Sequence, residues 1–257
     1  MSGRLSAVWR RAVCWVRTRL FPPSCFVCGR LLDLYDSTER DGALCSSCSA
    51  EWARAKREIC TACGKEISFC SCQNPLLEDA GCRTLRRLVF YRSGVGDPVQ
   101  NRLIYRFKYR RSHRTADFLA RELSGALRDL AVQEGLTCDN TVLVPIPRSR
   151  RAYRLYGTDQ AEELAAALSR CCGFPHLSVF QNTGHRLPKQ KELTAEARVH
   201  NARRAYRVRE KVPIKGKYVV LLDDVVTTGA TASACARKLK RRGVKGIFCF
   251  AIASDDL

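Results

Sequence analysis

The sequence predicts an α/β protein, in which helices cover a parallel sheet, with a small cysteine-rich module at its amino end. Two observations carry this prediction. Beyond residue 83, short apolar runs alternate with helical stretches, whereas ten of the 15 cysteines lie before that point. The change in pattern predicts a basic N-terminal helix over 1–24, a cysteine module over 25–82 and an α/β domain over 83–257.

The α/β part contains five elements that the apolar pattern picks out. Strands are expected over 141–146, 218–222 and 246–252, and helices over 159–170 and 230–242. Gly173 and Gly243 follow the two helices as C-terminal stops. Short apolar strands that alternate with helices are typical of a parallel sheet buried on both faces.

The composition sets limits on function. With 45 Lys+Arg against 25 Asp+Glu, the net charge is +20, which indicates an anionic partner. Nucleic acid, a phosphorylated small molecule and an acidic membrane surface all remain open on charge alone. A content of 46% hydrophobic residues excludes wholesale disorder, and the lack of any run of 18 apolar residues excludes a transmembrane helix.

The first 23 residues are basic and partly apolar. Trp9, Val13, Val16 and Leu20 fall on one helical face, but arginines interrupt every apolar run, which is unlike a secretory signal peptide. We therefore expect a cytoplasmic protein. Two interpretations of this helix stay open: it contacts a membrane or nucleic acid, or it packs on the next domain.

The cysteine module consists of paired cysteines. Two residues between the members of a pair let both thiolates reach one tetrahedral ion, so two structural zinc sites are predicted. Their ligands are expected to be Cys25, Cys28, Cys45 and Cys48 for the first, and Cys60, Cys63, Cys70 and Cys72 for the second. The second set ends in a C-x-C pair, and Cys82 is an alternative to Cys70 or Cys72.

The sharpest signal follows the apolar run at 218–222. Two adjacent acids come at the end of a buried strand, and a hydroxyl-rich turn with a glycine then opens a helix. The stretch comprises Asp223, Asp224, Val225, Val226, Thr227, Thr228, Gly229, Ala230 and Thr231. Hydroxyls and helix N-terminal N–H groups cradle a phosphate, whereas paired carboxylates suit sugar hydroxyls or a bound cation. A phosphorylated ribose with Mg²⁺ satisfies both requirements.

Residues 219–231 resemble the phosphoribosyl-pyrophosphate (PRPP) motif of type I phosphoribosyltransferases. This motif, the cysteine pairs and further segments at 106–109, 144–147, 156–161 and 186–206 together make the chain similar to the ComF family of competence-type proteins. The resemblance implies a double zinc ribbon joined to a parallel-sheet phosphoribosyltransferase fold. It also implies that Asp223 and Asp224 contact ribose and serve any catalysis, and that 227–231 holds the 5′-phosphate. Thr158-Asp159 departs from the Phe-Asn that the family leads us to expect.

Basic residues at two places are candidates for holding the pyrophosphate. Arg148, Arg150 and Arg151 follow the strand at 141–146, where the wider fold contacts pyrophosphate. Arg186, Lys189 and Arg198 lie in a long polar segment that resembles the mobile hood of the family. The alternative for both places is an exposed basic loop.

Aromatic residues alternate with basic ones around residue 107. Phe107, Lys108, Tyr109 and Arg111 suit stacked bases with phosphates alongside, which predicts single-stranded DNA binding, although such aromatics are often core residues. The family implies a role in DNA uptake during natural transformation, with the competence helicase as a further partner. The alternative is an active phosphoribosyltransferase of nucleotide metabolism without a DNA role; no residue clearly serves as a base.

Overall fold

The computed structural model describes residues 22–33, 42–94, 96–109, 112–183, 202 and 204–255. The chain divides into two compact units, Met1–Ala53 and Arg54–Leu257. The second cysteine group therefore belongs to the same unit as the sheet, and this division falls earlier than the predicted domain boundary. Almost all of the helix predicted over 1–24 lies outside the described residues. In the described part, no helix is long and apolar enough to cross a membrane.

The predicted parallel sheet is confirmed. It has four strands in the order β1-β6-β5-β2, and each neighbouring pair is parallel. The strands are β1 (Cys82–Phe90), β2 (Thr141–Pro145), β5 (Tyr218–Val226) and β6 (Gly246–Ser254). Pro145 is tolerated because β2 is an outer strand. Strand β5 runs past the predicted end at residue 222, so Asp223 and Asp224 are part of the strand itself.

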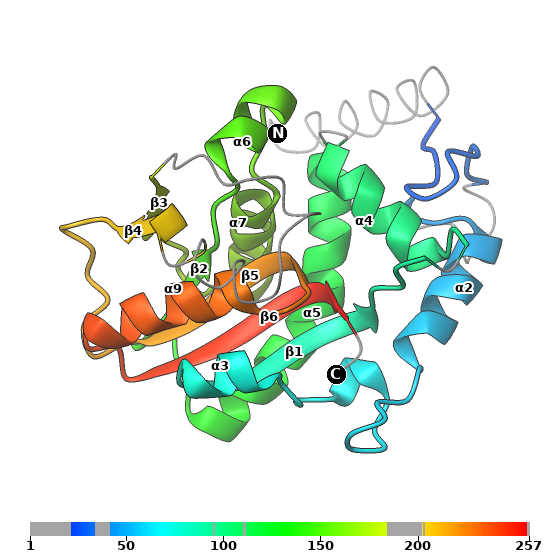
Figure 1. The fold of residues 1–257 in the computed structure, drawn as a ribbon. Helices are drawn as coiled ribbons and strands as arrows, with labels where there is room; N and C mark the ends of the chain where they lie inside the picture. The colour runs from blue at the N-terminus through cyan, green and yellow to red at the C-terminus, as the bar shows by residue number, and fades with distance from the viewer. Residues whose placement is uncertain are drawn as a thin grey trace, which may run out of the picture. The chain divides into compact units, whose positions relative to one another are not determined.

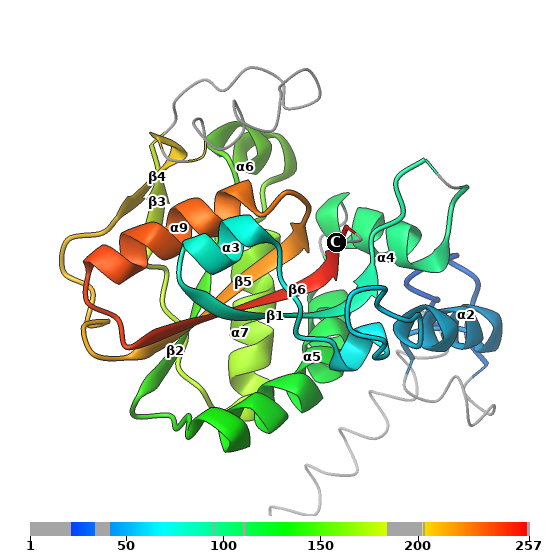
Figure 2. The same ribbon diagram turned by 60° about the horizontal axis from the view of Figure 1, so that its bottom comes forward.

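Helices cover both faces of the sheet. Figures 1 and 2 show α3 (Pro75–Asp79) and α9 (Ala230–Arg241) on one face, and α5 (His113–Glu134) and α7 (Gln160–Cys172) on the other. Apolar side chains of α3, α9 and alternate positions of β2, β5 and β6 form one buried cluster. The remaining elements of the described residues are α2 (Ser46–Lys56), the 3₁₀ helix η1 (Ile67–Phe69), α4 (Val99–Tyr109), α6 (Arg150–Tyr156), β3 (Phe180–Asn182) and β4 (Tyr206–Val208).

The two helices expected from the sequence are present with nearly the predicted bounds. Helix α7 begins where the Asp159 carboxylate accepts from the N–H of Glu162, and it ends at Gly173 in the left-handed conformation. Helix α5 was not predicted, although its signals are there: Ser112 caps its start and Gly135 closes it. Its leucines recur every three or four residues and are buried against the sheet.

Candidate functional site

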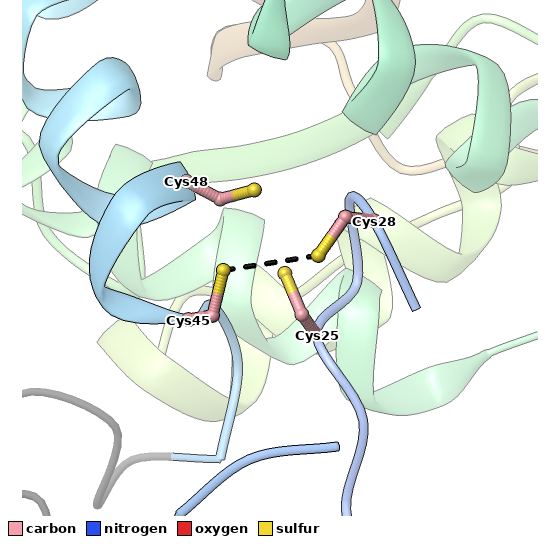
Figure 3. A group of neighbouring side chains, drawn as sticks. All are labelled: Cys25, Cys28, Cys45 and Cys48. Atoms are coloured by element: carbon pink, nitrogen blue, oxygen red, sulfur yellow. Dashed lines mark hydrogen bonds between the residues drawn. The ribbon is translucent and has the colours of Figure 1, made fainter. Parts of the chain in front are cut away.

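The first cysteine group is gathered as the spacing predicts. The sulfurs of Cys25, Cys28, Cys45 and Cys48 all lie within 4.8 Å of one another. Figure 3 shows two of them coming from a turn and two from the start of α2, with the dashed line joining Cys28 Sγ to Cys45 Sγ at 3.7 Å. Four thiols converging on one point are the donor set of a closed, structural zinc site.

The second cysteine group is Cys60, Cys63, Cys70 and Cys72, whose sulfurs also lie within 4.8 Å of one another. The alternative ligand, Cys82, is not among them. It lies buried in β1, where burial raises the pKa of its thiol to about 12. The C-x-C pair therefore completes the second site, and Cys82 is a core residue.

The two groups share the same turn. The N–H of Gly29 donates to the Cys25 carbonyl over 2.9 Å, and the N–H of Gly64 donates to the Cys60 carbonyl over 2.9 Å. Both glycines have a positive φ, of 80° and 69°, which a residue with a Cβ rarely adopts. The repeat explains why glycine follows the first pair of each group.

The electrostatic environment favours the thiolate at one cysteine of each group. Burial raises the pKa of Cys25, but hydrogen bonds from the backbone of Cys28, Cys45 and Val27 outweigh it and lower the pKa to about 7. Cys60 has the same balance of burial against hydrogen bonds, and its pKa is likewise lowered to about 7. One sulfur of each group thus has a lowered pKa, whereas burial raises the pKa of Cys28 and Cys48 in the first group and of Cys70 and Cys72 in the second. The donor sets fit structural Zn²⁺ at both sites.

The second candidate site lies at the carboxyl edge of the sheet. Strands β2 and β5 are parallel neighbours with Pro145 opposite Leu222, so the chain leaves both strands at the same edge. The N–H of Ile146, just past β2, donates to the Leu222 carbonyl over 2.9 Å. The carboxyl edge of a parallel sheet is where ligands bind in such folds, and Asp223 and Asp224 stand there.

Negative charge is concentrated at this edge. Burial, and next the charge of Asp224, raise the pKa of Asp223 well above its usual range. Lys108 opposes this effect, since its Nζ lies 3.6 Å from Asp224 Oδ2. Asp159 adds a third carboxyl whose charge acts on Asp223, and burial raises the pKa of Asp159 too. Acids held so close together against one lysine favour hydroxyl donors or a cation as ligand.

The turn after β5 has the features of an anion cradle. Gly229 adopts a φ of 72° at the start of α9, and the N–H of Ala230 donates to Thr228 Oγ1 over 3.4 Å. The side chain of Asn74 lies so close that a Cβ at Gly229 would be 2.6 Å from its Nδ2. The Thr228 hydroxyl therefore lies beside a backbone N–H at the N-terminus of α9, and hydroxyls and N–H groups in such a turn are the groups that bind a phosphate.

The residues predicted to hold pyrophosphate differ in their surroundings. Arg148 is half-buried: its Nη1 donates to the Lys108 carbonyl over 3.1 Å, and its guanidinium carbon lies 4.9 Å from the centre of the Tyr156 ring. Arg148 thereby positions the segment that carries Lys108. Arg150 is exposed at the start of α6. The side chains of Arg151, Arg186, Lys189, Arg198 and Arg111 lie outside the described residues.

The long polar segment is bracketed by β3 and β4, which pair antiparallel. Its two ends therefore lie side by side. Tyr206, in β4, has a pKa raised well above its usual range by burial, with the nearby charges of Cys235 and Asp223 adding to the effect. The base of the segment is thus close to the acids of β5.

The predicted nucleic-acid residues need one correction. Phe107 is buried at 1% exposure in α4, so its ring packs in the core and is not available to bases. Tyr109 is 41% exposed, and three further exposed tyrosines accompany it. We call this group, Tyr105, Tyr109, Tyr153 and Tyr156, the tyrosine surface. Tyr105 was missed, although its i, i+4 spacing to Tyr109 places both on one side of α4.

Three of the four rings of the tyrosine surface are in contact. Tyr105 and Tyr109 have ring centres 4.5 Å apart, and those of Tyr109 and Tyr156 are 4.8 Å apart. The Arg148 guanidinium lies over both Tyr109 and Tyr156. Aromatic faces combined with a cation form a platform of the kind on which bases stack.

Fold and sites define the class of protein: a double zinc ribbon joined to an α/β domain built on a parallel sheet. Residues 16–85 match the family model described as "Double zinc ribbon domain". Among solved structures, a hypoxanthine phosphoribosyltransferase from Staphylococcus aureus is 15% identical over 55% of this chain and 63% of its own, with a TM-score of 0.29.

Relatives identify the family. The DNA utilization protein YhgH of Salmonella typhimurium is 30% identical over 229 residues, which are 86% of this chain and 92% of that protein. Competence protein F of Haemophilus influenzae is 27% identical over 82% of this chain and 90% of its own. Competence protein ComFC of Streptococcus pneumoniae is 24% identical over 89% and 98%. The chain belongs to the ComF family.

Proposed function

We propose that this protein binds Mg²⁺–PRPP at the carboxyl edge of its sheet, binds single-stranded DNA, and serves DNA uptake in natural transformation. The observation that carries the ligand proposal is the convergence of Asp223 and Asp224 with Lys108 beside the Gly229 turn. The names of the relatives, a competence protein among them, support the DNA role.

Each part of PRPP has a matching group at the edge. The Asp223 and Asp224 carboxylates accept hydrogen bonds from the two ribose hydroxyls, whose donors compensate the crowded negative charge. The Thr227 and Thr228 hydroxyls and the N-terminus of α9 hold the 5′-phosphate. Mg²⁺, when bound, neutralises charge on the pyrophosphate. Exposed Arg150 adds positive charge near this end of the sheet.

Isothermal titration with Mg²⁺–PRPP tests the ligand. We expect saturable heat with the native protein and none with Asp223→Ala/Asp224→Ala. Asp117→Ala is the matched control, because Asp117, on α5, is a carboxylate that already forms an exposed ion pair with Arg170 of α7. The absence of heat with the native, zinc-loaded protein would refute the proposal.

Catalysis defines the alternative function, a phosphoribosyltransferase of nucleotide metabolism without a DNA role. Transfer would break the anomeric C–O bond, the pyrophosphate leaving with the electron pair, while a lone pair of the acceptor base forms the new bond to the anomeric carbon. Positioning and charge stabilisation would dominate such a step. A radiolabel exchange assay between pyrophosphate and PRPP, with candidate acceptor bases, separates the two functions. Exchange that depends on an acceptor, in a protein that does not bind DNA, would favour the alternative.

The tyrosine surface favours the DNA function. Its four rings are exposed by 38% to 64%, and the chain carries a net charge of +20. Stacking on aromatic side chains contributes about 1–3 kcal/mol per base, and phosphate contacts make binding fall with salt. The competence helicase, which would handle the same strand, is the natural protein partner to test afterwards by co-purification.

Fluorescence anisotropy with an oligo-dT strand tests the DNA proposal. Tyr105→Ala/Tyr109→Ala should weaken binding by about 10-fold or more, since at least one stacked base is lost. Phe69→Ala is the matched control, being an aromatic residue 63% exposed elsewhere in the same unit. Native binding that is weak and insensitive to salt would contradict the proposal, as would equal losses in the two variants.

A further inference from the structure

Arg87 is a fully buried arginine at the outer edge of the sheet. It lies in β1, and its side chain is 1% exposed. The strand is an outer one, paired only with β6 in the four-stranded sheet. A buried guanidinium is rare and costly, because it stays charged and loses its hydration. The charge that compensates it must therefore be close by.

The contacts of Arg87 lead to the second cysteine group. Its Nη2 donates to Cys70 Sγ over 3.3 Å, and its Nη1 donates to the Cys72 carbonyl over 2.8 Å. The guanidinium carbon lies 5.8 Å from the centre of the Phe90 ring, and Nε is buried with no partner. In the described part of the chain, no carboxylate forms an ion pair with Arg87.

The charge state of the cysteine sulfurs decides what balances the positive charge of Arg87. Four thiolates around one Zn²⁺ carry a net charge of about −2, whereas four neutral thiols carry none. A hydrogen bond from a guanidinium to a zinc-bound thiolate joins opposite charges in a site shielded from water, where such a bond is strong. We propose that Arg87 is the buried counter-charge of the second zinc–thiolate centre and anchors that centre to β1.

Neighbouring contacts support this anchoring. Thr84 Oγ1 donates to the Ser71 carbonyl over 3.1 Å, and Arg86 Nη1 donates to the Phe69 carbonyl over 2.8 Å. Side chains of β1 thus bind the chain segment that carries Cys70 and Cys72. Phe90, at the end of β1, packs with Cys60 and Cys70 in one apolar cluster. The second centre is therefore part of the sheet's packing.

The proposal predicts that retention of the second zinc ion depends on the positive charge of Arg87. In full-length, zinc-loaded protein, Arg87→Met should release one of the two zinc ions about 10–100-fold faster to a chromogenic chelator, the range for losing a partner of a metal ligand. Arg83→Met is the matched control, because Arg83 is another arginine of β1 and forms an exposed ion pair with Glu134 instead of binding the cysteine segment. We expect its release to stay within about twofold of native.

A spectroscopic measurement separates this role from packing. In cadmium-substituted protein, Arg87→Met should shift one ¹¹³Cd resonance, that of the second centre, and leave the other in place. If both resonances and both release rates match the native protein, the proposal is overturned. An apolar Met that merely fills space would give that result.

If Arg87→Met does not fold, a second pair of variants, one that retains the positive charge and one that is neutral, tests the proposal. Arg87→Lys retains the positive charge and should release zinc more slowly than the neutral Arg87→Gln by about 10-fold. Equal rates for these two variants would show that charge is irrelevant at this position, which would also overturn the proposal.

Discussion

Gly229→Ala probes the turn at the start of α9, where two costs can be worked out from the structure. The backbone φ of 72° is one that a residue with a Cβ reaches only at about 1–2 kcal/mol. The new Cβ would also stand 2.6 Å from Asn74 Nδ2 and 2.8 Å from its Oδ1, which is closer than non-bonded atoms approach. The Asn74 side chain must therefore move away.

Moving Asn74 has a cost of its own. Its Oδ1 accepts from the N–H of Leu77 over 3.1 Å and so caps α3, a contact worth about 1 kcal/mol. Adding the backbone strain gives a destabilisation of about 2–3 kcal/mol. At about 2–4 °C per kcal/mol for a unit of this size, the melting temperature should fall by about 4–12 °C. Thermal and denaturant unfolding of zinc-loaded protein measure it.

Two other glycines separate the contributions. Gly216 has a φ of 73° with nothing within 4 Å of its Cβ position, so Gly216→Ala should cost the backbone strain alone. Gly125, inside α5, has open space and an ordinary φ, so Gly125→Ala should be neutral or stabilising by up to about 1 kcal/mol. We expect the loss of stability on substitution by alanine to increase in the order Gly125, Gly216, Gly229.

A double-mutant cycle tests the Asn74 contact itself. Asn74→Ala alone should cost about 1 kcal/mol, but on the Gly229→Ala background it should cost nothing further, since the cap is already lost. Additive effects in the double variant would refute the reasoning, as would a Gly229→Ala variant no less stable than Gly216→Ala.

Three further outcomes follow from the sites. Because burial raises the pKa of Asp223, the native protein loses stability as the pH rises through that raised pKa. Asp223→Asn should remove this pH dependence and stabilise the ligand-free protein at neutral pH by about 0.5–2 kcal/mol. Melting temperatures measured across the pH range test both expectations. Phe107→Ala should cost about 3–5 kcal/mol in denaturant unfolding, whereas Tyr109→Ala should cost less than about 1, and equal costs would contradict the burial difference. Elemental analysis should find two bound zinc ions in Cys82→Ser but fewer in Cys72→Ser.

Much of both candidate sites could be predicted because local spacing encodes it. The eight cysteines fall into the two groups that their pairing indicates, and Asp223 and Asp224 lie at the carboxyl end of a buried strand. Strand β1 escaped prediction for a physical reason. Its three arginines interrupt the apolar pattern, yet Arg87 is buried, because the neighbouring cysteine group accepts its hydrogen bonds.

Burial could not be predicted within the aromatic–basic stretch. Phe107 and Tyr109 are two residues apart on α4, so they point in different directions, and only the packing of that helix decides that Phe107 is the one inside. Likewise, nothing in the local sequence around Arg148 indicates that its guanidinium binds the Lys108 carbonyl and covers Tyr156.

The sequence by itself determined the pairing of the cysteines, the strand that carries the acids and the glycine-bearing turn, since each depends on residues a few positions apart. The structure then excluded Cys82 from the second cysteine group. Only the tertiary structure decided which distant groups meet: Lys108 with Asp224, Asn74 with Gly229, and Arg87 with Cys70. The order of strands in the sheet and the packing of helices on it set these contacts. A charge or a side chain acquires its partner only when burial brings separate parts of the chain together.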